Sequence, residues 1–124
     1  MPMQIILKGK NMEIPTNVHD HATSKLNGLE KFVHPKESQE ILAETELGRR
    51  SRRHKKGDVY RAEINLTVDG ILHRSVAKKS DLMEAFDVAY NSIERQVRRG
   101  KKKSDSRIRR GARRAKEILR DFRG

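Results

Sequence analysis

The alternation of apolar and polar residues predicts four β-strands. The strands are expected at residues 3–9, 41–47, 59–68 and 71–79. The pair Asp69-Gly70 predicts a two-residue hairpin turn between the last two strands, because both positions tolerate a positive φ. In the fourth strand the pattern does not identify the buried face, since Leu72 and Val76 share one face with Arg74.

Apolar residues that recur every three or four positions predict two helices. The stripe of the first helix consists of Val18, Ala22, Leu26, Leu29 and Val33. The stripe of the second helix consists of Leu82, Ala85, Phe86, Ala89, Tyr90, Ile93 and Val97. Thr16 or Asn17 is the candidate N-cap of the first helix, which stops at Pro35, and Ser80 or Asp81 caps the second.

The order of these elements is strand, helix, three strands and helix. It predicts an α+β fold in which a four-stranded sheet carries both helices on one face and leaves the other face open to water or to a partner. A chain of 124 residues holds one such domain, here expected at residues 1–103. A basic extension at residues 104–124 is expected to be either disordered or helical.

Positive charge is concentrated in two segments of the chain. The net charge is +12, but residues 1–94 hold 15 Lys and Arg against 14 Asp and Glu, whereas residues 95–124 hold 14 against 3. Six of the cationic residues in the first part lie within residues 49–56, between two predicted strands. Because blocks of like charge repel themselves unless a polyanion neutralises them, this distribution indicates an anionic partner.

No motif in the sequence indicates catalysis, a metal ion or a cofactor. The chain has no cysteine, which excludes disulfides and thiolate metal sites, and it has no phosphate-binding glycine loop or metalloprotease motif. His19 and His21 would point about 200° apart on a helix, so they cannot share a metal ion and are expected to face solvent. We therefore expect a protein that is not an enzyme and has neither catalytic residues nor cofactors.

The sequence shows neither a signal peptide nor a long apolar segment. Nowhere do 18 apolar residues follow one another, and the first nine residues lack a charged region followed by an apolar run. We therefore expect a soluble, cytoplasmic protein that has no membrane and no small-molecule substrate among its partners.

The candidate binding residues come from the basic loop and from the second helix. The loop contributes Arg49, Arg50, Arg52 and Arg53, and the helix with its continuation contributes Arg95, Arg98, Arg99, Lys101 and Lys102. Guanidinium groups suit bidentate contacts with phosphate. Because only 4% of the residues are aromatic, binding to the shape of a structured RNA explains the charge better than a platform for stacking single-stranded bases.

Four segments also carry a resemblance to a known family. They are MQIILKGKNMEIP near the start, KLNGLEKF at 25–32, DLMEAFD at 81–87 and IERQVRRGKKK at 93–103. In their order and spacing over residues 3–103 they resemble the ribosome hibernation promoting factors and ribosome-associated inhibitors, whose fold is similar to that of double-stranded-RNA-binding domains. The family pattern departs at Leu82 and Met83, where a Met-Tyr pair is common.

This resemblance implies a function and a set of contacts. Family members bind the small ribosomal subunit between head and body, where they block the mRNA and tRNA sites in stationary phase or under stress. Their contacts with rRNA correspond here to Arg74, Lys78, Lys79, Arg95, Arg98, Arg99, Lys101 and Lys102. Long members add a second domain that pairs ribosomes, so a chain of this length resembles the short members and is expected to be monomeric away from the ribosome.

Three other functions remain open on the sequence alone. A constitutive ribosomal protein or RNA chaperone would have the same composition. A small ribonuclease could use His19 or His21 together with a lysine. A DNA-associated regulator is suggested by the charge, although no recognition-helix pattern is found.

Overall fold

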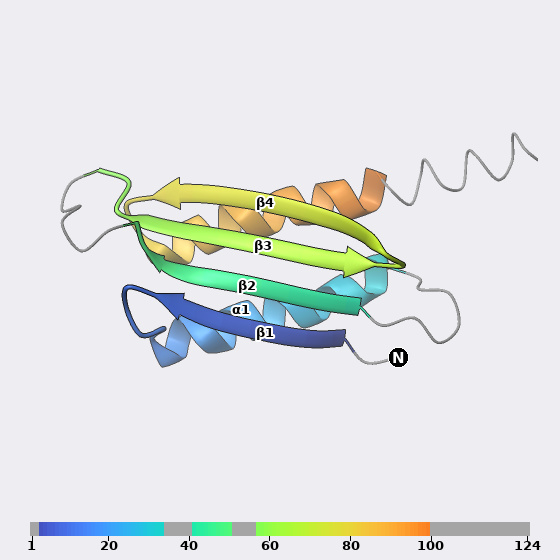
Figure 1. The fold of residues 1–124 in the computed structure, drawn as a ribbon, viewed down its shortest axis with the longest axis horizontal. Coiled ribbons are helices and arrows are strands. Elements are labelled where there is room, and N and C mark those ends of the chain that lie inside the picture. Colours follow the sequence, from blue (N-terminus) through green and yellow to red (C-terminus); the bar gives the residue numbers. More distant parts are fainter. Residues whose placement is uncertain (1–2, 34–40, 51–56, 100–124) are drawn as a thin grey trace, which may run out of the picture.

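The computed structural model describes residues 3–33, 41–50 and 57–99. The elements follow in the order β1 (Met3–Lys10), α1 (Thr16–Asn27), a 3-10 helix (Gly28–Phe32), β2 (Ile41–Arg49), β3 (Tyr60–Val68), β4 (Ile71–Lys79) and a second helix over residues 82–99 (Figure 1). Predictions for Pro35 and for the extension at 104–124 lie outside the described residues.

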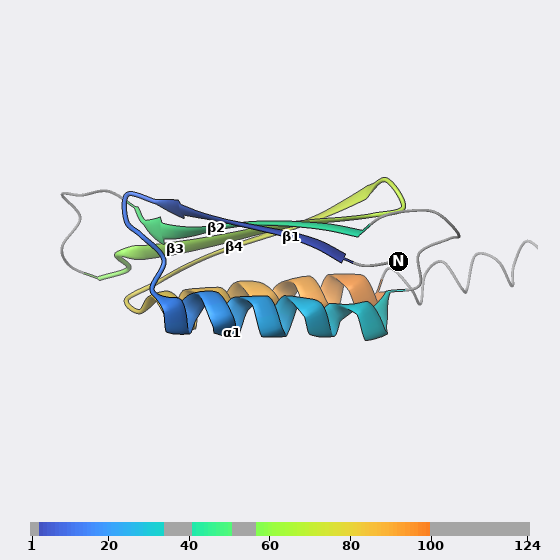
Figure 2. The same ribbon diagram turned by 90° about the horizontal axis from the view of Figure 1, so that it is seen from below.

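The four strands form one mixed sheet in the order β1-β2-β3-β4. β1 and β2 are parallel, with Lys10 opposite Gly48, and β3 is antiparallel to both β2 and β4. α1 and the second helix lie side by side on one face of the sheet, and the other face is not covered by any described element (Figure 2). The predicted α+β architecture is confirmed, and the finer likeness to double-stranded-RNA-binding domains stays a prediction.

The core lies between the sheet and the two helices. The residues of both predicted helical stripes are buried there, and the sheet contributes Ile41, Ala43, Leu47, Ala62, Ile64 and Leu66. Ser75 of β4 is buried as well, and its hydroxyl donates a hydrogen bond of 2.7 Å to the carbonyl of Ala89. This bond ties β4 to the second helix and satisfies a hydroxyl that would be costly to bury alone.

β4 buries small side chains in the core and exposes larger apolar ones. Ser75 and Ala77 are buried, whereas Leu72 and Val76 are 59% and 41% exposed on the open face of the sheet. Because side chains alternate along a strand, Arg74 projects from the open face together with these two apolar residues. The hydrophobic pattern could not reveal this orientation, since the larger apolar side chains are the exposed ones.

The ends of the first helix differ from the prediction. Pro15, with φ −59° and ψ 146°, occupies the non-helical cap position of α1, and no side chain caps the helix. The prediction that Thr16 or Asn17 is the N-cap is therefore wrong, because the helix already begins at Thr16. The helix also ends earlier than expected, since Gly28–Phe32 is a 3-10 helix, although Leu29 within it stays buried.

The second helix begins where the sequence predicts. The Asp81 carboxylate accepts a hydrogen bond of 3.0 Å from the backbone N–H of Glu84, which is the geometry of an N-cap. Within the ranges 3–33, 41–50 and 57–99, no helix is both long and apolar enough to cross a membrane.

Candidate nucleic-acid interface

The predicted binding residues that the structure describes lie mainly in two separate places. Arg95, Arg98 and Arg99 lie at the end of the second helix, and Arg49, Arg50 and Lys78 lie where β2 and β4 end. The second helix starts just after β4 and runs back along the sheet, so its 18 residues place the two groups about 25 Å apart at 1.5 Å per residue (Figure 1). Arg52, Arg53, Lys101 and Lys102 lie outside the described residues.

The first place is a basic surface formed by the ends of both helices, which we name the helix-end surface. It consists of the exposed residues Lys25, Lys31, Arg95, Arg98 and Arg99. Arg95 and Arg99 are one helical turn apart and therefore project from the same side of the helix. Arg98 forms an ion pair of 2.7 Å with Glu94, whereas no ion pair of Arg95 or Arg99 is found within the described part of the chain.

Aromatic rings hold three of these cations in place. The guanidinium carbon of Arg98 lies 4.2 Å from the centre of the Phe32 ring, and the Lys31 Nζ lies 5.0 Å from the same centre. The Lys25 Nζ lies 5.2 Å from the centre of the Tyr90 ring. Such cation–π contacts fix the cationic groups of the two helices beside one another, so the positive surface is preorganised for a negatively charged partner.

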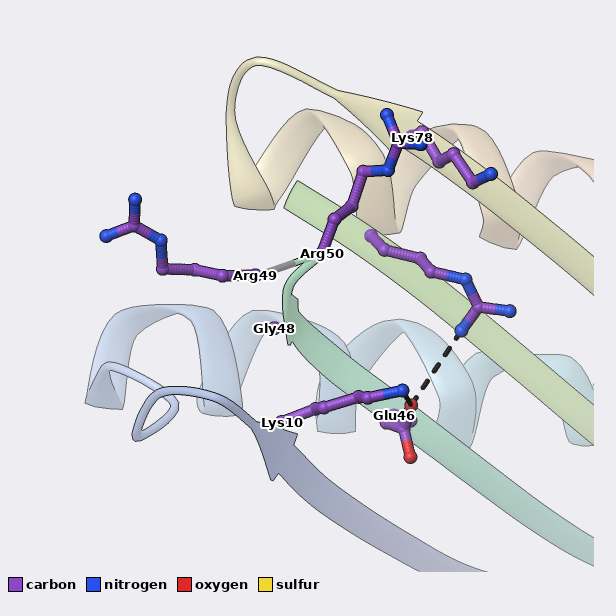
Figure 3. A pocket seen from close by; sticks show the side chains of 7 residues that line it. Lys10, Glu46, Gly48, Arg49, Arg50 and Lys78 are labelled. Atoms are coloured by element: carbon purple, nitrogen blue, oxygen red, sulfur yellow. Dashed lines mark ion pairs between the residues drawn. The ribbon is translucent and has the colours of Figure 1, made fainter. Parts of the chain in front are cut away.

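The second place is a hollow of about 120 Å³ on the open face of the sheet, which we name the strand-end pocket (Figure 3). Its lining consists of Lys10, Glu46, Gly48, Arg49, Arg50, Arg61 and Lys78. Figure 3 shows Arg50 extending from the end of β2 toward Lys78, whereas Arg49 points away from the other cations. Four cationic side chains, those of Lys10, Arg50, Arg61 and Lys78, thus lie around a hollow in which Glu46 is the one carboxylate among the described lining residues.

Gly48 lines the strand-end pocket and determines how closely β1 approaches β2 there. Gly48 is buried opposite Lys10 in the parallel pair of β1 and β2. A Cβ added at Gly48 would meet the backbone of Lys10, with its nitrogen at 2.8 Å, its carbonyl carbon at 2.7 Å and its carbonyl oxygen closer still. Only glycine therefore lets β1 lie this close to β2, and that closeness brings the Lys10 side chain over the hollow.

Arg74 and Lys79, which the family resemblance also assigns to rRNA contact, lie elsewhere. Arg74 projects from the middle of the open face and bonds to the Glu63 carboxylate at 2.6 Å. Lys79 alternates with the exposed Lys78 and is half-buried. The Arg74 guanidinium holds the pKa of Glu63 below its ordinary value of 4.5, and Arg61 and Asn65 add to this effect against the opposing effect of burial.

Replacing Glu63 with Gln is expected to reduce the loss of stability in acid. Because the pKa of Glu63 is lowered in the folded chain, its contribution to the free energy of unfolding is complete above pH 4.5 and is lost as the pH falls through the folded pKa. Urea unfolding of the parent and of Glu63→Gln at about pH 6 and about pH 3 measures this contribution. The parent should lose more stability over that interval, and an equal loss in both chains would contradict this account of the pair.

His19 and His21 differ in their surroundings. His19 is exposed as predicted, but His21 is half-buried, because its Nε2 lies 2.7 Å from the Asp87 carboxylate and its ring packs edge-on against Phe86. The prediction that both histidines face solvent is therefore wrong for His21, which joins α1 to the second helix. Among residues 3–33, 41–50 and 57–99, no cluster of His, Asp and Glu could hold a metal ion.

Sequence reasoning missed four cations of the two surfaces. Lys25 and Lys31 lie toward the end of the first predicted helix, where a pair of cations six positions apart would have been their signal. Lys10 and Arg61 join the strand-end pocket through the register, which places Lys10 opposite Gly48 and Gly48 opposite Arg61. That pairing cannot be derived from a single sequence, because a shift by two residues would keep the same face exposed.

Comparison with known sequences identifies relatives. A family model described as sigma 54 modulation protein / S30EA ribosomal protein matches residues 5–105. The ribosome hibernation promotion factor of Bacillus subtilis (strain 168) is 25% identical over 107 residues, which are 86% of this chain and 53% of the relative. The factor of the same name from Mycobacterium tuberculosis is 30% identical over 98 residues, 79% of this chain and 43% of the relative. The chain thus spans about half the length of these curated relatives.

Comparison with solved structures gives the same fold. The crystal structure of the N-terminal domain of Protein Y from Thermus thermophilus has a TM-score of 0.62 and 28% identity, and the match covers 80% of this chain and 98% of that domain. A ribosomal subunit interface protein from Coxiella burnetii has a TM-score of 0.56 over the same shares of the two chains. At 17% identity this second likeness concerns the fold alone.

Proposed function

From the premise that the chain belongs to the sigma 54 modulation protein / S30EA ribosomal protein family, we propose that it is a ribosome hibernation factor. In this proposal it binds the rRNA of the small ribosomal subunit and blocks the sites of mRNA and tRNA in stationary phase or under stress. The names of its relatives in Bacillus subtilis and Mycobacterium tuberculosis support this function.

The helix-end surface is the observation that carries the proposal. Its five cations come from α1, from the 3-10 helix that follows it and from the second helix, and the sheet behind them fixes how the helices lie. Arg95 and Arg99 have no ion pair within the described residues, so their charge is available to phosphate oxygens. Charge-assisted hydrogen bonds of this kind are stronger than neutral ones and suit the folded RNA surface of a ribosomal subunit.

The proposed mechanism is occupancy and not catalysis. A folded body that binds rRNA at the mRNA and tRNA sites prevents both ligands from entering, and no bond has to be made or broken. Affinity and its dependence on salt are then the functional quantities, because each phosphate contact releases counterions. Arg74, Lys78, Lys79, Lys101 and Lys102 belong to the proposed rRNA contacts through the family resemblance, and the protein is proposed to be a cytoplasmic monomer when it is off the ribosome.

A competition experiment tests the blocking of the sites. Purified small subunits are loaded with mRNA and labelled initiator tRNA, and the chain is then added at increasing concentration before filter binding. Exclusive binding is expected, so that the retained tRNA falls as the chain binds. Subunits that retain the tRNA and the chain together would contradict the proposed mechanism.

A further inference from the structure

The strand-end pocket has no role in the binding surface formed by the two helices. It lies on the open face of the sheet, at the opposite end from Arg95 and Arg99. An inference from it therefore concerns a site apart from that surface, although Lys78 in its lining is also among the proposed rRNA contacts.

Positive charge in the pocket exceeds the negative charge that is present to balance it. The Glu46 carboxylate lies 3.9 Å from the Lys10 Nζ and 3.7 Å from Arg61, so one carboxylate is shared between two cations. Arg61 also pairs with Glu63 at 3.0 Å, outside the pocket lining. The positive charge of Lys10 and Arg61 on this side of the pocket is therefore only partly neutralised by carboxylates.

The other side of the pocket carries two cations for which no carboxylate partner is found within the described residues. Arg50 donates a hydrogen bond of 3.3 Å to the backbone carbonyl of Asp58, and this bond does not neutralise its charge. Lys78 is exposed on β4 and has no ion pair among residues 3–33, 41–50 and 57–99. Because cations held close together repel each other, an anion that enters between them relieves this repulsion as well as forming new bonds.

The lining selects the chemical class of that anion. Among the described residues that line the pocket there is no aromatic ring and no side-chain amide, so none of them stacks on a base or reads the edge of one. The cations approach from β1, from the end of β2, from β3 and from β4. A tetrahedral group, whose oxygens point in several directions, can bond to cations on all these sides, whereas a planar carboxylate offers two oxygens in one plane.

We propose that the strand-end pocket is a binding site for one phosphate group. Lys10, Arg50, Arg61 and Lys78 supply the positive charge around the hollow that they line together with Gly48. The phosphate belongs either to the backbone of an RNA or to a free phosphate compound. The pocket recognises the same chemistry in both cases.

Titration of the ¹⁵N-labelled chain with inorganic pyrophosphate, followed by NMR, tests this site without ribosomes. The backbone amide signals of residues 10, 48, 61 and 78 are expected to shift together and to saturate. A chain with Lys10→Ala should bind about fivefold more weakly, a change of about 1 kcal/mol, since one charge of the pocket is lost. The matched control Lys8→Ala loses the same charge on the same face of β1, outside the pocket, and should bind as the parent does.

Two further measurements decide between the sources of the phosphate and can overturn the site. If the source is RNA, the pocket variant also binds small subunits more weakly than the matched control; if the source is a free compound, the two bind subunits equally well. Acetate at the same ionic strength should not saturate the pocket signals. Signals that acetate shifts equally, or that pyrophosphate does not shift, would overturn the proposal while leaving the helix-end surface and the proposed function unaffected.

Discussion

A chain with Arg95→Ala and Arg99→Ala is expected to bind small ribosomal subunits about 30-fold more weakly than the parent at about 0.15 M salt. The estimate assumes that each side chain contacts one phosphate. The affinity per contact is taken to fall with about the 0.9 power of the salt concentration, as in duplex DNA, and to vanish at about 1 M salt. Both side chains are exposed at the end of the second helix, away from the buried Ile93 and Val97. The fold should therefore persist, and sedimentation of the labelled variant with subunits measures the loss.

The conservative variant separates charge from structure. With Arg95→Lys and Arg99→Lys the chain keeps both charges and should keep most of its affinity, because a point charge still attracts phosphate. The alanine variant should also lower the slope of log affinity against log salt by about 2 relative to the parent. An alanine variant that sediments with the parent's affinity and salt slope would show that the helix-end surface does not contact rRNA.

Gly48→Ala is expected to lower the free energy of unfolding by about 1–3 kcal/mol, the usual cost of adding a methyl group where no space exists. The added Cβ would meet the backbone of Lys10, and a backbone cannot move aside as the end of a flexible side chain can. To relieve the overlap, β1 must move away from β2, which also carries Lys10 away from the strand-end pocket. Urea unfolding measures the stability.

Gly28→Ala is the matched control for this substitution. Gly28 has an ordinary helical φ of −65°, and a Cβ added there would meet no atom within 4 Å. Alanine at this position is expected to raise the free energy of unfolding by about 0.4–1 kcal/mol, because it restricts the unfolded chain. Equal destabilisation by both substitutions would contradict the role assigned to Gly48.

Much of the fold could be predicted from periodicity because one face of each element is buried. Residues 60–68 alternate strictly, and Ala62, Ile64 and Leu66 are all fully buried. β4 is the exception, because the sheet buries the small Ser75 and Ala77 under the second helix and exposes Leu72 and Val76. Small side chains fit where a helix packs closely, and a hydropathy pattern does not record the closeness of packing.

The candidate binding site could be predicted only in part. Charge along the sequence identified Arg95, Arg98 and Arg99, because three cations within five positions of one helix must lie near one another. The charge pattern could not predict that Lys31 lies near Arg98. These two cations are brought together by the ring of Phe32 in the 3-10 helix, which both of them contact. The strand-end pocket depends on strand register and on the missing side chain of Gly48, and neither leaves a charge pattern.

We propose that this chain binds the small ribosomal subunit through cations on a preorganised fold. Sedimentation of the purified chain with purified small subunits through a sucrose gradient at physiological ionic strength tests this binding. The chain is expected to migrate with the subunit in a ratio near one to one and to be released as the salt concentration rises. A chain that stays at the top of the gradient under these conditions would show that it does not bind the subunit.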